Sequence, residues 1–322
     1  MSMDYRVKKK KKKKKKQGTN SKNTENQFQC LPDDIVLNIF DELSDIKWLC
    51  RCFVVSKRFS YLIPRVQTVS VKRISFNKGL LGKDPPKLWP PFPLNVPGFE
   101  FLYVLTRIRS LNLKIDSDFS RNNDSVFKWA AKFTTKQDSV SFLYAKSLTK
   151  MMEKSEAEEG EIVNQISLKR MMRRVKLGGE CLKHAVLWLA ILSHVVLQHP
   201  TLQSITVTDS KNKGVKLCLA GEKLVEFRNA FHLDRVISLL GSWTAENIRV
   251  GYVPIILLPM SRYVMKGVTI IDFKLYCDGD SEADSAMVDG FAGEQGVFSE
   301  AMVQILKNHK DGIKAFNFYD QN

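Results

Sequence analysis

Histidine and cysteine are the residues here with the greatest capacity for metal binding or nucleophilic chemistry, but neither type forms a recognisable site. The six cysteines are scattered, and none forms a C-x-x-C pair that could bind a metal. Cys50 and Cys52 are two residues apart, so on a helix they point in different directions. His194 interrupts an apolar run, and it is predicted to be a hydrogen-bonded core histidine and not a ligand. The sequence therefore predicts no metal site and no cofactor.

The motifs of the common catalytic classes are also missing from the sequence. The chain contains no G-x-S-x-G elbow, no H-E-x-x-H zinc motif, no G-x-G-x-x-G turn and no G-x-x-x-x-G-K-[ST] phosphate loop. Segment 79–83, GLLGK, is too short to be a phosphate loop. These absences predict a non-catalytic protein. An enzyme of unknown type in residues 66–322 stays an alternative, because residues that cluster only in space are invisible in a sequence.

A group of cations is the clearest candidate for ligand binding in the second half of the chain. Positive charge recurs on one predicted helix at Lys169, Arg170, Arg173, Arg174 and Lys176. The apolar residues between them form the other side of that helix, so a solvated face above a core stripe is the interpretation that we favour. The alternative is a docking site for an acidic substrate or a phosphate group. For that alternative the candidate substrate-binding residues are Lys169, Arg170, Arg173 and Arg174.

The net charge of the chain is +16, but much of it lies in one tail. Nine consecutive lysines, Lys8 to Lys16, carry nine of these charges and leave +7 for the rest of the chain. Adjacent ammonium groups repel one another, so residues 1–29 are predicted to form a disordered lysine-rich tail. The run matches a nuclear-import signal, and a solvated tail without a role is the alternative. The mildly basic remainder argues against a nucleic-acid partner, although a nuclear nucleic-acid-associated protein acting through basic segments stays an alternative function.

The cysteines and the apolar runs predict a location in the nucleus and/or the cytoplasm. Reduced, mostly buried thiols are the simplest interpretation of cysteines without an evident pairing pattern. No apolar stretch follows the basic N-terminus, so no signal peptide is predicted. The longest apolar run, Ala185 to Leu197, is shorter than the roughly 20 residues that a membrane-spanning helix needs. It predicts a buried core helix and no membrane partner.

Three short helices are predicted between residues 31 and 63. Leu31-Pro32 opens the first, because proline is tolerated where the first helical N–H would have no partner. Ile35, Ile39 and Leu43 then recur at a spacing of four, which places them on one face. About 33 residues are too few to bury this many apolar groups among themselves. Some of them must therefore cover a partner protein or, alternatively, the rest of the same chain.

The order of these residues resembles an F-box. The string reads Leu-Pro-Asp-Asp-Ile at 31–35, Ile-Phe at 39–40, Asp-Ile-Lys-Trp-Leu-Cys-Arg-Cys at 45–52 and Val-Ser-Lys-Arg-Phe at 55–59. The resemblance implies an F-box over residues 30–65 that binds a Skp-type adaptor. The adaptor-binding residues that it implies are Leu31, Pro32, Ile35, Ile39, Leu43, Leu49, Val55 and Phe59.

An F-box in this position implies a function as well as a fold. F-box proteins of this kind are non-catalytic substrate-recognition subunits of SCF-type (Skp-cullin-F-box) E3 ubiquitin ligases. The implied partners are a Skp-type adaptor, the cullin and RING subunits that it recruits, and a protein substrate of unknown identity. Residues 66–322 would then form the domain that recognises the substrate.

Residues 66–322 alternate predicted strands with predicted helices, which favours a mixed α/β domain after the three-helix F-box. Strands are predicted at 66–76, 108–115, 139–145, 204–210, 215–221, 246–258 and 268–277, and helices at 162–176, 180–198 and 299–310. The first of these helices is predicted to end at Gly178-Gly179. Leu111-Asn112-Leu113 is similar to a leucine-rich-repeat strand, so a degenerate leucine-rich-repeat-like domain is the leading architecture, although the repeat spacing is irregular.

Three segments of the second half resemble the plant F-box proteins called auxin-up-regulated. They are HPTLQSITVTDSKNKGVKLCL at 199–219, LPMSRYVMKGVTIIDFK at 258–274 and FSEAMVQILKNHKDGIKAF at 298–316. One departure is Arg262, where the resemblance leads us to expect a glycine. Two further segments are predicted to be loops: the proline-rich segment 84–98 and the acidic segment 153–161.

Overall fold

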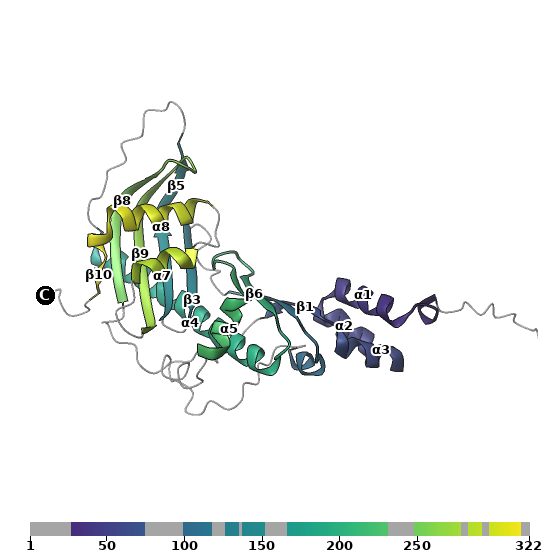
Figure 1. The fold of residues 1–322 in the computed structure, drawn as a ribbon. Helices are drawn as coiled ribbons and strands as arrows, with labels where there is room; N and C mark the ends of the chain where they lie inside the picture. Colours follow the sequence, from purple (N-terminus) through teal and green to yellow (C-terminus); the bar gives the residue numbers. More distant parts are fainter. Residues whose placement is uncertain are drawn as a thin grey trace, which may run out of the picture.

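The structure, a computed structural model, describes residues 27–74, 99–117, 126–134, 137–151, 166–230, 248–277, 283–291 and 296–316. Figure 1 shows three N-terminal helices at one end of the molecule, a small sheet in the middle and a larger sheet at the other end. This arrangement confirms the predicted class of helices followed by a mixed helix and sheet domain. The predictions for the lysine run, for segment 84–98 and for segment 153–161 lie outside the described residues.

Side-chain caps start the second and the third of the N-terminal helices. The three helices are α1 at Asp33–Leu43, α2 at Ile46–Phe53 and α3 at Lys57–Leu62, and a 3-10 turn, η2, follows at Ile63–Arg65. Asp45 caps α2, because its side chain accepts a hydrogen bond of 3.0 Å from the backbone N–H of Lys47. Ser56 caps α3 in the same way, with a 3.1 Å bond from the N–H of Phe59. Between the first two helices, Ser44 adopts a left-handed φ of 43° that ends α1.

A four-stranded sheet follows these helices, in the order β1-β2-β6-β7. Its strands are β1 at Thr68–Ile74, β2 at Ser110–Ile115, β6 at Ser204–Asp209 and β7 at Leu217–Ala220. The first three are parallel and stack in register, so that Val69, Leu111 and Ile205 form one buried row. Stacked parallel strands of this kind resemble those of leucine-rich repeats. The likeness is confined to this sheet, because the second sheet is antiparallel.

The second sheet has six strands, in the order β10-β8-β9-β4-β3 with β5 also paired to β9. The strands are β3 at Val126–Phe133, β4 at Gln137–Ala145, β5 at Ser147–Lys150, β8 at Ile248–Leu258, β9 at Tyr263–Cys277 and β10 at Lys314–Ala315. Figure 1 shows α7 (Ala283–Phe291) and α8 (Val297–Asn308) across one face of this sheet and α4 (Leu168–Gln198) behind it. The sequence did not predict β3, because Lys128 and Lys132 interrupt its apolar pattern.

The long helix α4, Leu168–Gln198, is a single element of 31 residues. The sequence predicted two helices separated at Gly178-Gly179, and this prediction is wrong. Gly178 lies inside the helix, and a Cβ atom added to it would lie 3.3 Å from the side chains of Ile271 and Phe273 on β9. The glycine therefore permits a close approach between helix and sheet, and it does not end the helix.

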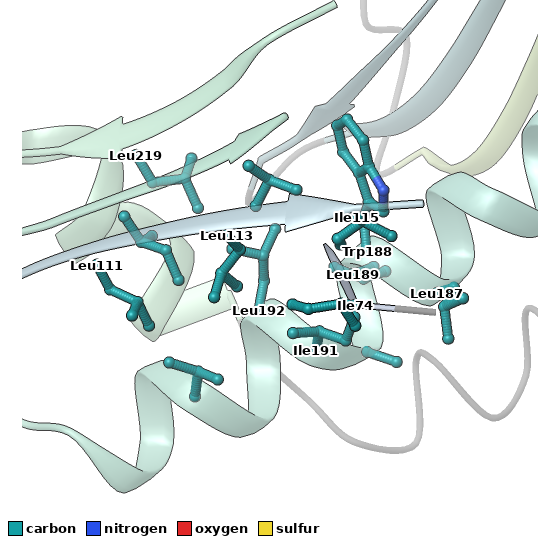
Figure 2. Close-up of a cluster of buried hydrophobic side chains, with 14 of the residues drawn as sticks. Ile74, Leu111, Leu113, Ile115, Leu187, Trp188, Leu189, Ile191, Leu192 and Leu219 are labelled. Atoms are coloured by element: carbon teal, nitrogen blue, oxygen red, sulfur yellow. The ribbon is translucent and has the colours of Figure 1, made fainter. Parts of the chain in front are cut away.

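The second half of α4 forms the core of the molecule with the four-stranded sheet. Figure 2 shows Trp188, Ile191 and Leu192 of the helix in one cluster with Leu111 and Leu113 of β2, where Leu192 lies next to Leu113. These five side chains are at most 1% exposed. The helix α5, Glu222–Ala230, adds Leu224 and Phe227 to the same cluster. In the described residues, α4 is long and apolar enough to span a membrane, but 72% of its most apolar window is buried. That burial identifies it as a core helix.

The two sheets are joined by a short contact between β3 and the loop after β6. The N–H of Trp129 donates to the carbonyl of Lys213 at 2.9 Å, and the N–H of Val215 donates to the carbonyl of Trp129 at 2.8 Å. The indole of Trp129 also packs on Trp188 of α4, with ring centres 4.7 Å apart. Gly214 fits beneath this indole, where a Cβ atom would lie 2.7 Å from the ring. The sheets are thus connected by a bridge and by α4, which crosses both.

Candidate adaptor-binding surface

The apolar residues of α1 are divided between a buried face and an exposed face. Val36 and Phe40 are 0% and 2% exposed and belong to the core. Ile35, Ile39 and Leu43 are 41%, 38% and 37% exposed. Because residues four apart lie on the same side of a helix, these three form an apolar row along the outer side of α1, which we call the exposed row. A solvent-facing apolar row beside a complete core is typical of a protein-binding surface.

Other predicted adaptor-binding residues are also at the surface. Five of the eight are exposed, namely Pro32, Ile35, Ile39, Leu43 and Val55. Val55 and its neighbour Val54 are 68% and 80% exposed in the turn between α2 and α3. Figure 1 places all three helices at the end of the molecule remote from the six-stranded sheet, so that sheet and its helices do not cover them.

The remaining three predicted residues lie inside the helical unit. Leu49 differs most from the prediction: it is 0% exposed and packs in the core, so its side chain cannot reach a partner in this structure. Leu31 and Phe59 are partly buried and pack against the same core. The ring of Phe59 stands edge-on to the rings of Phe40 and Phe28, with centres 5.1 Å and 6.0 Å away. These three residues therefore pack inside the helical unit and support the exposed adaptor-binding residues.

Arg58 fixes the chain that leads into α1. Its guanidinium donates to the carbonyl of Phe28 at 2.8 Å and to the carbonyl of Leu31, and it pairs with the Asp33 carboxylate at 2.7 Å. The side chain is only 31% exposed, so these bonds are partly shielded from water. The positions of Leu31 and Pro32 at the start of the exposed row therefore depend on an arginine in α3.

Two exposed aromatic residues on these helices were not predicted as site residues. Trp48 is 51% exposed and lies under the guanidinium of Arg51, 4.6 Å from the ring centre. Tyr61 is 67% exposed, with Arg65 at 5.8 Å from its ring centre. The sequence contained a signal for Trp48, because it directly precedes Leu49 on a predicted helix and consecutive helical residues point in different directions. Aromatic residues next to arginine are frequent anchors in protein interfaces.

The unit that carries the exposed row is joined directly to the first sheet. The Asp41 carboxylate in α1 accepts hydrogen bonds from the N–H groups of Gln67 and Thr68, at 2.7 Å and 2.9 Å. The N–H of Ser70 in β1 donates to the carbonyl of Ser44 at 2.8 Å. The helices and the sheet therefore form a continuous structure, and the row has a defined direction relative to the rest of the chain.

The candidate substrate-binding cations occupy the first turns of α4, and the structure separates Arg174 from the others. Lys169, Arg170 and Arg173 are exposed. Arg174 is half-buried: it donates to the carbonyl of Gly267 at 3.1 Å, and its guanidinium lies 4.4 Å from the ring centre of Tyr144. Burial lowers the pKa of Arg174, and the positive charge of Arg170 lowers it further. Arg174 thus attaches α4 to the sheet.

The described residues contain no group of three or more His, Cys, Asp or Glu side chains that could hold a metal ion. His194 is half-buried and hydrogen-bonded to the hydroxyl of Tyr103, as predicted for a core histidine. Burial raises the pKa of the Cys181 thiol well above its ordinary value, which makes it a poor nucleophile.

Comparison with known proteins agrees with this geometry. Residues 28–66 match the F-box-like family. The F-box protein AUF2 of Arabidopsis thaliana is 23% identical over 325 residues, which cover 90% of this chain and 99% of that protein. The F-box proteins At4g18380 and At1g30200 of the same plant are 25% and 24% identical, each across 76% of this chain and 82% of its own length. No solved structure is significantly similar to the chain.

F-box domains in general bind Skp adaptors within SCF complexes, and F-box proteins in general are non-catalytic adaptor subunits. The matched residues here fold into three capped helices with an exposed apolar row, and the similarity to the Arabidopsis proteins extends over most of the chain. The chain therefore carries an F-box-like domain at residues 28–66, and most of its length is similar to F-box proteins of Arabidopsis thaliana, AUF2 among them.

Proposed function

We propose that this chain is the substrate-recognition subunit of an SCF-type E3 ubiquitin ligase. In this proposal the F-box binds a Skp-type adaptor through the exposed row, and the adaptor connects the chain to the cullin and RING subunits. The domain after residue 65 holds a target protein for ubiquitination. The chain itself makes or breaks no bond: by holding the target, it raises the concentration of target lysines near the ubiquitin-charged enzyme.

The exposed row is the observation that carries this proposal. Val36 and Phe40 already supply the contacts that hold α1 on its own chain. Ile35, Ile39 and Leu43 therefore contribute little to the core, and their burial is available to a partner. A partner groove that covers them would remove apolar surface from water at about 25 cal/mol per Å².

The proposal is tested by placing charge in the row. We expect I35E/I39E to lose adaptor co-purification, because two carboxylates would have to enter an apolar interface without a partner. The melting temperature should stay within about 3 °C of the unchanged protein, since both side chains face water in the free chain. Co-purification with a Skp-type adaptor and thermal unfolding are the two measurements.

The matched control introduces the same two charges on other helices. V225E/V303E replaces apolar residues of α5 and α8 that are 53% and 44% exposed, and it should retain the adaptor fully. Full adaptor binding by I35E/I39E, or equal loss in both double variants, would contradict the proposal.

We further propose that the protein acts in the nucleus and/or the cytoplasm, where SCF-type ligases would meet their targets. Within the described residues, the cysteines at 30, 50, 52, 181 and 218 are free thiols, which fits a reducing compartment. Imaging of the tagged full chain tests this assignment, and an extracellular or vacuolar signal would exclude it.

A further inference from the structure

Three segments that are far apart in the sequence meet around Gly267 on β9. Arg174 of α4 donates to the Gly267 carbonyl, and its guanidinium also lies over Tyr144 of β4. The N–H of Lys146 donates to the carbonyl of Lys266 at 2.9 Å. A Cβ atom placed on Gly267 would lie 3.1 Å from the Cβ of Lys146. The start of α4, the corner between β4 and β5, and β9 therefore share one region of the surface.

These segments contain many cations and no carboxylate. Residues 139–151, 166–179 and 250–271 include no Asp or Glu. Their cations are Lys146, Lys150, Lys169, Arg170, Arg173, Arg174, Lys176, Arg262 and Lys266. The ion pairs found within the described part of the chain involve other residues. These stretches themselves therefore supply no negative charge to balance their cations.

The arrangement of the cations on α4 is unfavourable for the helix by itself. Lys169 and Arg173 are four residues apart, as are Arg170 and Arg174, and like charges at this spacing destabilise a helix. The positive charge of Arg170 also lowers the pKa of Arg174, as expected for two cations at this spacing. An anionic partner would relieve this repulsion and would be attracted by the summed field of the surface.

Apolar side chains lie among these cations. Leu168 and Met172 are 49% and 40% exposed and lie one helical turn apart, so they share a side of α4. Methionine adapts readily to different partners because its side chain is unbranched and polarisable. Two aromatic residues of these segments, Tyr144 and Tyr252, have the guanidinium of Arg174 over their rings, at 4.4 Å and 5.9 Å. A surface with aliphatic side chains and occupied aromatic faces favours a peptide over bases that stack.

We propose that this region binds an acidic segment of the target protein that also carries aliphatic side chains. We call it the cationic surface and define it by Lys146, Lys169, Arg170, Arg173, Lys176, Lys266, Leu168 and Met172. Carboxylates of the target contact the lysines and arginines, and a leucine or isoleucine of the target packs on Leu168 and Met172. This inference rests on the proposed function, because it names the class of segment that the receptor recognises.

The test uses the full chain and a fluorescein-labelled 12-residue peptide of alternating Glu and Leu pairs, with binding measured by fluorescence anisotropy. K146E/R170E/R173E should weaken binding about tenfold or more, as expected for several exposed charge pairs turned into repulsions. L168S/M172S should weaken it about threefold. The matched control K211E/K216E/K314E changes three exposed lysines outside the surface and should stay within about twofold. The lysine run is present in every variant, so its attraction for the peptide is common to all.

A neutral variant shows whether a loss of peptide binding comes from the lost charge or from misfolding. K146Q/R170Q/R173Q should keep the melting temperature and give a loss between those of the control and the charge reversal. A peptide with Gln in place of Glu should bind at least about tenfold more weakly to the unchanged chain. Equal affinities for the control and both surface variants would overturn the inference.

Two further probes separate the acidic peptide from other anions. A 12-nucleotide single-stranded RNA and phosphatidylserine vesicles should lose less affinity in K146E/R170E/R173E than the peptide does. An equal or larger loss with either probe than with the peptide would overturn the inference in favour of nucleic acid or membrane. Adaptor co-purification is measured in parallel: its failure in the unchanged chain contradicts the proposed ligase role, whereas failure of the peptide series alone contradicts only the cationic surface.

Discussion

At the scale of single residues, α1 shows how neighbouring side chains with the same chemistry take different roles. Ile35 and Val36 are adjacent aliphatic residues, yet the first is 41% exposed and the second is 0% exposed. The 100° turn between consecutive helical residues is sufficient to separate them. Charged residues divide in the same way, because Arg58 is held by backbone carbonyls whereas its neighbour Lys57 is exposed. The first prediction at this scale compares Arg58 with Lys57, and the second concerns two partly buried histidines.

Replacing Arg58 by methionine should weaken adaptor binding more than it weakens the fold. The change removes three bonds to backbone carbonyls, those of Phe28, Gln29 and Leu31, and an ion pair that is partly exposed. We therefore expect a loss of about 1–2 kcal/mol in the free energy of unfolding. Leu31 and Pro32 lose their anchor, so adaptor affinity should fall about fivefold or more. Urea denaturation and titration with the adaptor measure the two effects. Lys57→Met is the control, and a similar loss in it would refute the role given to Arg58.

Folding stability should fall as the pH is lowered below about 6.5. Burial lowers the pKa of His194, and burial followed by the charge of His194 lowers the pKa of His199. The unfolded chain then takes up protons at a higher pH than the folded chain does. The contribution of the neutral imidazoles to the free energy of unfolding is fully present above the ordinary histidine pKa, and it declines as the pH falls below that value. Urea denaturation between pH 5 and 7.5 should give a flatter profile for H194Q/H199N, and an unchanged slope would exclude these histidines as the cause.

At the scale of elements, α4 determines how the second half of the chain is assembled. Its first turns attach to β9 and β4 through Arg174, its middle touches β9 at Gly178, and its last turns cover the four-stranded sheet. A single helix of 31 residues is about 46 Å long, which is sufficient to cross both sheets. The two adjacent glycines in its middle are therefore in different environments.

The glycine pair offers a matched test of this packing. Gly178→Leu should destabilise the protein by about 1–3 kcal/mol, because the new side chain must displace Ile271 and Phe273. Gly179→Leu meets no atom within 4 Å of its Cβ and should be neutral or stabilising by up to about 1 kcal/mol, since leucine favours helix over glycine. Thermal unfolding monitored at 222 nm compares them. Equal melting temperatures would show that α4 does not approach β9 as closely as described.

At the scale of the whole molecule, the exposed row and the cationic surface are parts of one connected structure. Asp41 joins α1 to the start of β1, and the contact of Trp129 with the 213–215 segment joins the two sheets. A target held on the cationic surface would therefore have a defined position relative to the adaptor. Defined geometry of this kind raises the frequency of productive lysine positions beyond what a flexible tether provides.

Asp41→Ala should loosen this connection without removing the exposed row. Two backbone N–H groups would lose their acceptor, at a cost of about 1–2 kcal/mol. Hydrogen exchange of the Gln67 and Thr68 amides should accelerate, whereas adaptor binding should persist. Glu42→Ala, at the exposed neighbouring position, should leave exchange at 67 and 68 unchanged. Unaltered exchange in the Asp41 variant would argue against a fixed junction.

Sequence periodicity alone determined the elements whose signals are local. The helices near 31–63 were predicted from the Leu31-Pro32 opening and from apolar spacing, and the strands near 110–115 and 204–209 from their residue patterns, because interactions between residues close in sequence decide these elements. The F-box assignment came from the same segment. The spacing of Ile35, Ile39 and Leu43 was therefore sufficient to predict an apolar row on one side of the first helix.

Only the tertiary structure decided which apolar or charged side chain is covered. Leu49 and Ile39 look alike in the sequence, but Leu49 is enclosed in the core and Ile39 faces water. Gly178-Gly179 carries the signal of a helix end, yet the helix continues because packing on β9 requires a small residue there. Arg174 belongs to a run of cations and still serves as an anchor. Burial depends on which distant segments come together, and a local pattern contains no information about that choice.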